Sequence, residues 1–172
     1  MRGLMLGLAT LVVITAAPAW AAEWKTVRDA EAHVTIDMPG AYKTEPQTNK
    51  TELGAIPGVN YSVTTGSAYY VLSASNFGNE LGSTPAAEIL EPFVDGAIEG
   101  MSATKTSTRK ITVSGAEGRD VTYTLQVEGV AVSGRMRVLY RNGWVYAAQA
   151  LTFGQDDNTT GDRFLGSLRL LD

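Results

Sequence analysis

The sequence predicts an α+β protein that is built around a single antiparallel β-sheet. Apolar and polar residues alternate along several segments, which is the pattern of strands with one buried face. The turn signals Glu128-Gly129 and Asn142-Gly143 join three successive segments, and strands that are joined by such short turns run antiparallel. Two other stretches carry apolar residues at helical spacing. Because strands and helices do not alternate along the chain, the sequence does not favour a Rossmann-type nucleotide fold.

Residues 1–21 have the features of a secretory signal peptide. Arg2 precedes an uncharged apolar run, and Ala19-Trp20-Ala21 places small residues at the positions that a signal peptidase requires. The apolar run is shorter than the roughly 20 residues that span a membrane. We therefore expect cleavage after Ala21, a single domain over residues 22–172, no membrane span after cleavage, and a periplasmic or secreted location.

The first half of the mature chain contains several predicted strands. Alternation predicts strands over residues 24–28, 34–38, 59–65 and 69–77. The last two pair as a hairpin around Gly66-Ser67. Residues 41–58 contain prolines and few apolar side chains, so we expect a loop there with at most a short strand near residues 51–55.

A helix is predicted to follow these strands. Thr84 is placed to cap it, and Pro85 lies at a position where its missing N–H costs nothing. Pro92 lies inside the stretch, so we expect it to kink or split the helix. The apolar residues that form one stripe at helical spacing are Ala86, Ile89, Leu90, Phe93, Ala97, Ile98 and Met101.

The second half has the clearest strand pattern. A strand pattern begins at Ile111, and residues 115–118 are expected to form a turn. Three more strands are predicted over residues 121–127, 130–141 and 144–153. The last of these is apolar on both faces, so we expect it at the centre of the sheet, covered on both sides. Thr159 and Asp162 have capping-box spacing, which predicts a short C-terminal helix.

Several local motifs resemble one superfamily. They are the strand ending HVTIDMPGAY, the helix TPAAEILEPFVDGAIEGM, the meander that begins GAEGRDVTYTL, and the closing segment DRFLGSLRL. In this order, over residues 24–171, they are similar to the PsbP/Mog-like superfamily, which unites the PsbP extrinsic photosystem proteins, the Mog-type Ran-binding import factor and exported bacterial relatives. The resemblance implies an α/β/α sandwich and an accessory or binding role. It transfers no catalytic or ion-binding residue to this chain.

The composition excludes several kinds of site. The chain has no cysteine, one histidine and a net charge of -4. It therefore has neither a disulfide framework nor the ligands for a zinc site, and its charge argues against nucleic-acid binding. A Ser-His-Asp triad would need His33, which we expect at a strand start facing away from the core, and the sequence lacks a Gly-x-Ser-x-Gly elbow.

The first candidate site is a row of arginines on one predicted strand. Arg135, Arg137 and Arg141 share one face of it, with Arg119 and Lys110 on neighbouring strands. Because guanidinium groups pair with carboxylates, the row is a candidate surface for an acidic partner. The alternative is a solvated strand face whose arginines pair across the sheet, for example with an aspartate at position 120. On the first interpretation, replacing the first two arginines by alanine weakens binding and leaves the melting temperature nearly unchanged.

The second candidate site is an acidic loop before the last helix. Asp156, Asn158 and Thr160 match the first oxygen ligands of an EF-hand loop, and Gly161 matches its glycine. Ser167 stands where the bidentate glutamate would be. The loop is therefore a candidate for weak calcium binding, and the alternative is an acidic segment that stabilises the helix N-terminus.

These observations predict a binding protein rather than an enzyme. No set of nucleophile, base and orienting residue can be assembled from the sequence. We expect an exported, non-enzymatic binding or assembly module of the cell envelope, with an envelope protein as its partner and no cofactor. The alternative is a protein that binds a small ligand or a cation, with weak calcium binding as one form.

Overall fold

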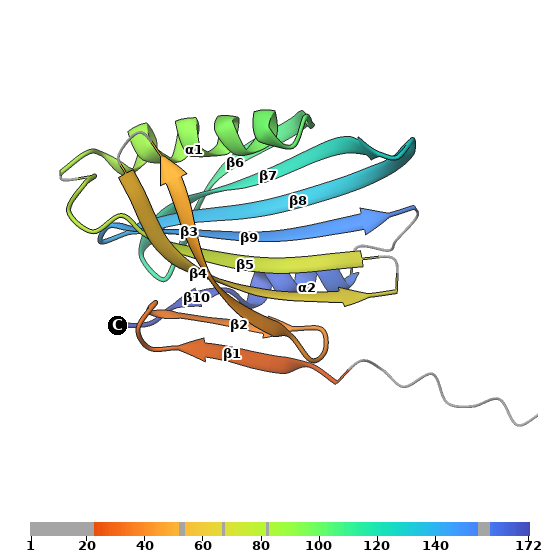
Figure 1. The fold of residues 1–172 in the computed structure, drawn as a ribbon, viewed down its shortest axis with the longest axis horizontal. Coiled ribbons are helices and arrows are strands. Elements are labelled where there is room, and N and C mark those ends of the chain that lie inside the picture. Colours follow the sequence, from red (N-terminus) through yellow and green to blue (C-terminus); the bar gives the residue numbers. More distant parts are fainter. Residues whose placement is uncertain (1–22, 52–53, 67, 82, 155–158) are drawn as a thin grey trace, which may run out of the picture.

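The computed structural model describes residues 23–51, 54–66, 68–81, 83–154 and 159–172. Within them the chain forms two antiparallel sheets and two helices (Figure 1). The predicted signal peptide, residues 1–21, lies outside the described residues. Neither described helix combines the length and the apolar character that crossing a membrane would need.

The main sheet is antiparallel throughout and has the strand order β3-β4-β5-β9-β8-β7-β6. Strand β9 is its middle member, as the apolar character of both its faces predicted. The two predicted tight turns are confirmed, because Glu128 and Asn142 have φ of 51° and each is followed by a glycine with positive φ. The strands are β3 (Lys43–Thr51), β4 (Gly54–Thr65), β5 (Ala68–Asn76), β6 (Thr104–Val113), β7 (Ala116–Val127), β8 (Val130–Arg141) and β9 (Trp144–Phe153).

A second, smaller sheet corrects the expectation of a single sheet. Strand β2 (Val34–Met38) lies between β1 (Lys25–Asp29) and β10 (Arg169–Leu170), and pairs antiparallel with both. The sequence predicted β1 and β2 but not β10, because two residues are too few to show alternation. The backbone N–H of Leu171 donates to the carbonyl of His33 at 2.8 Å, which continues the pairing at the end of this sheet.

The two faces of the main sheet are covered differently (Figure 1). Helix α1 (Ala86–Gly100) packs on β7 and β8, and we call that side the α1 face. Helix α2 (Thr159–Ser167) and the small sheet pack on the opposite side, the α2 face. The fold is therefore a sheet-rich, antiparallel α+β fold. It departs from a plain α/β/α sandwich, because a second sheet forms much of the layer on the α2 face.

Helix α1 differs from its prediction at two points. It begins at Ala86 with Pro85 as its N-cap residue, and no side chain caps it, so Thr84 is not the cap. It also runs as one helix through Pro92. Pro92 is exposed, so the carbonyl that loses its partner, at Glu88, lies on the solvent side of the helix where water can replace the missing N–H.

One predicted loop and part of one predicted turn are strands in the structure. Residues 43–51 form the edge strand β3, which shows no alternation because nearly all its side chains are exposed. Its Pro46 is tolerated because an edge strand leaves half of its backbone groups unpaired. Strand β6 likewise begins at Thr104 rather than at Ile111, and the following turn is confined to residues 114–115, so Gly118 lies within β7.

Candidate functional site

The predicted arginine row lies on one face of β8. Arg135, Arg137 and Arg141 all point to the α2 face, and they alternate along the strand with residues that point to the α1 face. Leu139, which shares their face, is fully buried. Arg119 does not belong to the row. It is fully buried on the α1 face, where it donates to Glu91 of α1 at 2.8 Å.

Arg137 forms a two-point ion pair with Asp120 of β7. Its Nε and Nη2 donate to the two carboxylate oxygens at 2.7 Å and 2.9 Å, and its Nη1 donates to the carbonyl of Leu165 in α2 at 2.8 Å. Arg109 of β6 donates to the same carboxylate at 2.9 Å. Burial raises the pKa of Asp120, but the two arginines outweigh burial and hold it below its usual value. Arg137 therefore joins β7, β8 and α2 together.

The other two arginines of the row have different neighbours. Arg135 pairs with Asp162 of α2 at 2.5 Å. Within the part of the chain that the structure describes, Arg141 makes only long contacts, at 3.4 Å to the carbonyl of Ser114 and at 3.5 Å to the carboxylate of Asp172. Its side chain is 27% exposed. Of the three arginines, Arg141 thus has donors that are least committed within the fold.

The predicted cation loop falls mostly outside the described residues. Asp156 and Asn158 lie there, and Thr160 is half-buried in the first turn of α2. Among the residues that the structure describes, no group of three acidic or histidine side chains is placed to hold a metal ion. Calcium binding at this loop stays a prediction.

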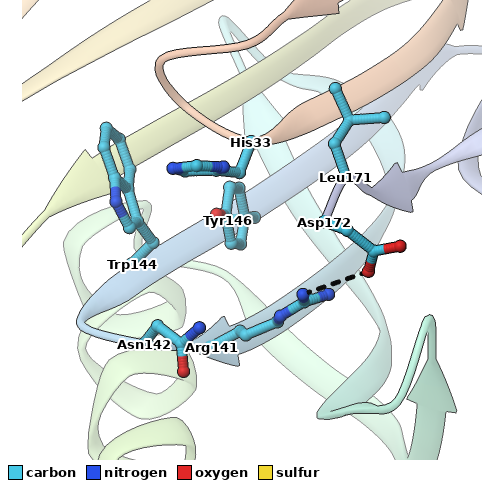
Figure 2. Close-up of a pocket in the computed structure, with 7 residues that line it drawn as sticks. All are labelled: His33, Arg141, Asn142, Trp144, Tyr146, Leu171 and Asp172. Atoms are coloured by element: carbon cyan, nitrogen blue, oxygen red, sulfur yellow. Dashed lines mark hydrogen bonds and ion pairs between the residues drawn. The ribbon is translucent and has the colours of Figure 1, made fainter.

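Arg141 belongs to a small pocket at one end of the main sheet, which we call the Trp144 pocket (Figure 2). Its volume is about 150 Å³. Three segments that are distant in the sequence meet there: the turn before β2, the hairpin between β8 and β9, and the residues after β10. The residues that line it are His33, Arg141, Asn142, Trp144, Tyr146, Leu171 and Asp172.

The turns at the pocket place its side chains. His33 has a φ of 51° and an exposed side chain, which agrees with the expectation that it faces away from the core. Asn142 also has positive φ, in the hairpin that leads into Trp144. Trp144 and Tyr146 stack with ring centroids 6.1 Å apart and an interplanar angle of 15°. Burial raises the pKa of Tyr146 to about 12, so its hydroxyl keeps its proton at neutral pH.

A second cavity, of about 400 Å³, lies on the other side of Trp144. It contains Asp29, whose Oδ1 accepts the backbone N–H groups of Glu31 and Ala32 at 2.8 Å and 2.9 Å. The hydroxyl of Tyr61 donates to Oδ2. Burial raises the pKa of Asp29, but these hydrogen bonds outweigh it and hold the pKa below its usual value. This carboxylate is therefore ionised and saturated with donors, which suits it to hold the β1–β2 turn in place.

The Trp144 pocket carries groups that can recognise a ligand. In the part of the chain that the structure describes, His33 has no hydrogen bond to a serine or to a carboxylate, so it lacks the partners of a nucleophile–base pair. The pocket combines stacked aromatic rings, an arginine and an asparagine.

Sequence reasoning selected Arg141 but missed the aromatic residues. The signal that was available was the Asn142-Gly143 turn, which places Trp144 at the start of a central strand.

Comparisons with known proteins define the fold. No family model matches the chain, and no curated protein matches its sequence. The solution structure of cyanobacterial PsbP from Synechocystis sp. PCC 6803 is similar, with a TM-score of 0.57, 9% identity, and coverage of 92% of this chain and 98% of that one. A protein from Bacteroides thetaiotaomicron has a TM-score of 0.54 and 7% identity, over 86% of this chain and 48% of its own. LpqN of Mycobacterium tuberculosis, described as involved in cell envelope biogenesis, has a TM-score of 0.49 and 12% identity, over 87% and 91%.

The similarity to cyanobacterial PsbP confirms, at the level of the fold, the resemblance that the motifs indicated. The chain has a PsbP-like fold. At such low identity the similarity establishes the fold and transfers no function.

Proposed function

We propose that the protein is an exported binding module of the cell envelope, which binds a protein partner through the Trp144 pocket and catalyses no reaction. The export part of the proposal rests on the signal-peptide pattern of residues 1–21. The binding part rests on the pocket, because tryptophan, tyrosine and arginine are the residues that most often dominate the energy of protein interfaces.

The single observation that carries the proposal is the state of Arg141. Its nearest acceptors are 3.4 Å and 3.5 Å away, whereas Arg137 is held at 2.7–2.9 Å by Asp120 and Leu165. A guanidinium group beside stacked aromatic rings can donate hydrogen bonds to a partner's carboxylate without first breaking a strong contact. The expected partner therefore presents an acidic side chain next to an apolar one.

Photo-crosslinking in intact envelopes tests this function. A photoreactive residue at Asn142, on the rim of the Trp144 pocket, should give one discrete adduct, whereas the same residue at the exposed Gln126 should not. Arg141→Glu should reduce the adduct at least about tenfold, as expected for a central arginine of an interface. The charge reversal Lys110→Glu, at an exposed position of β6, is the matched control. An adduct that survives Arg141→Glu, or none at Asn142, contradicts the proposal.

Weak calcium binding at Asp156, Asn158 and Thr160 is the second candidate function, favoured only by the ligand spacing. A cation that binds the folded state raises the melting temperature by mass action. Calcium at millimolar concentration should therefore raise the melting temperature of the protein more than magnesium does. The variant Asp156→Asn should remove the difference. Equal shifts with both cations, or no shift, would exclude this function.

A further inference from the structure

A groove on the α1 face lies apart from the Trp144 pocket. We call this cavity, of about 440 Å³, the α1 groove. Helix α1 covers β7 and β8 but leaves part of β5 and β9 uncovered, and these two strands form the floor. One wall is α1 and the other is the end of β3, which rises toward the helix (Figure 1).

Two glycines shape the walls of the groove. Gly96 of α1 has open space where a side chain would begin, because a Cβ there would meet no atom within 4 Å. On the other wall, a Cβ at Gly58 of β4 would lie 2.5 Å from the carbonyl oxygen of Ala74. Because Gly58 has no side chain, residues of β3 can reach across β4. Asn49 does so and donates from Nδ2 to Ser75 of β5 at 3.2 Å.

The lining of the α1 groove combines polar and apolar side chains and carries no formal charge. Its hydrogen-bonding side chains come from three strands and are those of Gln47, Asn49, Ser73, Ser75 and Gln149, besides a threonine. None of its lining residues is acidic or basic, although 19% of the residues in the chain are charged. Among the described residues, the amide of Gln149 donates only to the sulfur of Met136 at 3.2 Å, which is a weak acceptor. The amide is therefore free to exchange that contact for a better one.

Two aromatic rings belong to the apolar part of the groove, besides Pro92, Ala97 and Ala147. Phe93 of α1 and Phe77, which follows β5, both line it and are half-buried. Side-chain amides and hydroxyls beside aromatic faces can contact a ring that carries C–H groups on its faces and hydroxyls at its edge. An apolar ligand would leave the amides and hydroxyls of the floor without partners, which costs free energy. An ionised ligand would find no opposite charge among the lining residues.

An extended peptide is also a poor match for this groove. Peptides that add to a sheet pair with the backbone of an unpaired edge strand. Strands β5 and β9 are interior, and their backbone groups are paired with neighbours on both sides. A ligand on this floor therefore meets side chains and not a free backbone edge.

We propose that the α1 groove binds a neutral polyhydroxylated ligand, of the chemical class of an uncharged oligosaccharide. The hydroxyls of the ligand pair with Asn49, Ser73 and Gln149, and a sugar face packs on Phe93. The site is on the opposite face of the sheet from Arg135 and Arg137, and it does not depend on the proposed function of the Trp144 pocket.

Titration of the ¹⁵N-labelled protein with defined sugars tests the proposal. The probes are maltotriose, cellotriose and tri-N-acetylchitotriose, with trigalacturonic acid as the charged counterpart. At least one neutral probe should shift the side-chain amide signals of Asn49 and Gln149 in a saturable way. Trigalacturonic acid should bind at least about tenfold more weakly, because a buried carboxylate without a partner is unfavourable.

Matched variants separate specific binding from a general effect on the protein. Gln149→Leu and Asn49→Leu should each weaken binding about tenfold through the lost hydrogen bonds. Gln126→Leu, on an exposed part of β7, is the control and should leave binding unchanged. The proposal is overturned if no neutral probe gives a saturable shift, if trigalacturonic acid binds as tightly, or if the two groove variants bind as well as the control.

Discussion

The closed α2 face and the open part of the α1 face differ in the charges that they carry. On the α2 face, helix α2 and the small sheet close over β8, and the arginines beneath them are tied to Asp120 and Asp162. On the α1 face, one helix covers half of the sheet, and the open half is lined by neutral polar side chains. A charge in a closed layer needs a partner from within the fold, whereas an open groove can use water until a ligand arrives.

This difference changes how the charged residues are interpreted. The arginines of β8 are the most visible feature of the sequence, yet Arg135 and Arg137 serve as contacts between the layers. The sites with uncommitted groups are the Trp144 pocket at the end of the sheet and the α1 groove. Neither stands out in the sequence, because each is assembled from segments that are far apart along the chain.

The largest expected effect tests the closed α2 face. Asp120→Ala should lower the free energy of unfolding by about 3 kcal/mol, because it leaves the half-buried Arg137 without its carboxylate. Asp95→Ala is the matched control. Its ion pair with Lys105 is well exposed, so we expect a loss below about 0.5 kcal/mol. Urea denaturation measures both, and equal losses would show that the α2 face is no more closed than the outer surface.

The same contacts revise one expectation from the sequence. Replacing Arg135 and Arg137 together was expected to leave the melting temperature nearly unchanged. The hydrogen bonds from Arg137 to Asp120 and to the carbonyl of Leu165 instead predict a clear decrease. Arg135→Ala alone should have little effect, because its partner Asp162 is 63% exposed. A thermal melt of both single variants separates the two contributions.

Acid should act on the α2 face through Asp120. Its pKa in the folded protein lies below the usual value near 3.8, so its contribution to stability is present above that value and is lost as the pH falls through the folded pKa. Asp120→Asn should therefore have a lower free energy of unfolding than the unaltered protein at pH 7, and this difference should shrink as the pH falls below about 4. Urea denaturation across this range measures it. A deficit that does not change with pH would mean that the ionised carboxylate is not the stabilising form.

The success of prediction from the sequence also differs between regions. Strands β8 and β9 were predicted with the correct bounds, because alternation is strong where one face is buried and the turns around them need residues with positive φ. Strand β7 begins at Ala116, earlier than the predicted start at residue 121. Strand β3 was missed because an exposed edge strand is formed by backbone pairing, which leaves no hydrophobic pattern. The face on which Arg119 lies was also not predicted. The predicted strand began after Arg119, so its pattern did not assign this side chain to either face of the sheet.

The candidate sites were harder to predict than the fold. Arg141 was selected from its place on β8, but its role depends on how firmly its neighbours hold it, and only the structure shows those distances. The Trp144 pocket joins residues 33, 144 and 171, and the proximity of residues 33 and 171 follows from the pairing of β10 with β2. A two-residue strand leaves no signal in the sequence from which that pairing can be derived.

The next effect tests the closed half of the α1 face. A Cβ at Gly134 of β8 would lie 2.1 Å from a ring carbon of Tyr123 on β7, and both residues are buried. Gly134→Ala should therefore lower the free energy of unfolding by about 2 kcal/mol through overpacking. Gly166→Ala is the control, because a Cβ at this exposed position meets no atom within 4 Å. If both variants unfold at the same urea concentration, the ring has room to move and this part of the face is not tightly packed.

Removal of the hydroxyl of Tyr123 is expected to raise the free energy of unfolding, by less than the losses described above. This group is buried and has no hydrogen-bond partner among the described residues, and burial raises the pKa of Tyr123 to about 12. Tyr123→Phe should stabilise the protein by about 1 kcal/mol at pH 7, because it removes an unsatisfied buried group. The unfolded chain ionises near pH 10 and the folded chain only near 12, so the unaltered protein loses stability between these values.

The advantage of the phenylalanine variant should therefore grow as the pH rises from 10 to 12. Urea denaturation at pH 7 and at pH 11 measures both parts of the prediction. Tyr61→Phe is a useful contrast, because the hydroxyl of Tyr61 donates to Asp29 and its removal should destabilise the protein at pH 7. If Tyr123→Phe is destabilising by a similar amount, the hydroxyl of Tyr123 has a partner in solution and the α1 face is wetter than its packing indicates.

The smallest effect separates the stability of the α1 face from its use as a binding site. Gly96 lies inside α1, where glycine is less favourable than alanine by about 0.5–1 kcal/mol, and a Cβ there meets no neighbour. Gly96→Ala should therefore stabilise the protein by about that amount. Gly96 also lines the α1 groove, so the added methyl group should weaken the binding of a neutral oligosaccharide severalfold. Stability and binding that rise together would show that no ligand occupies the space at Gly96, which contradicts this prediction.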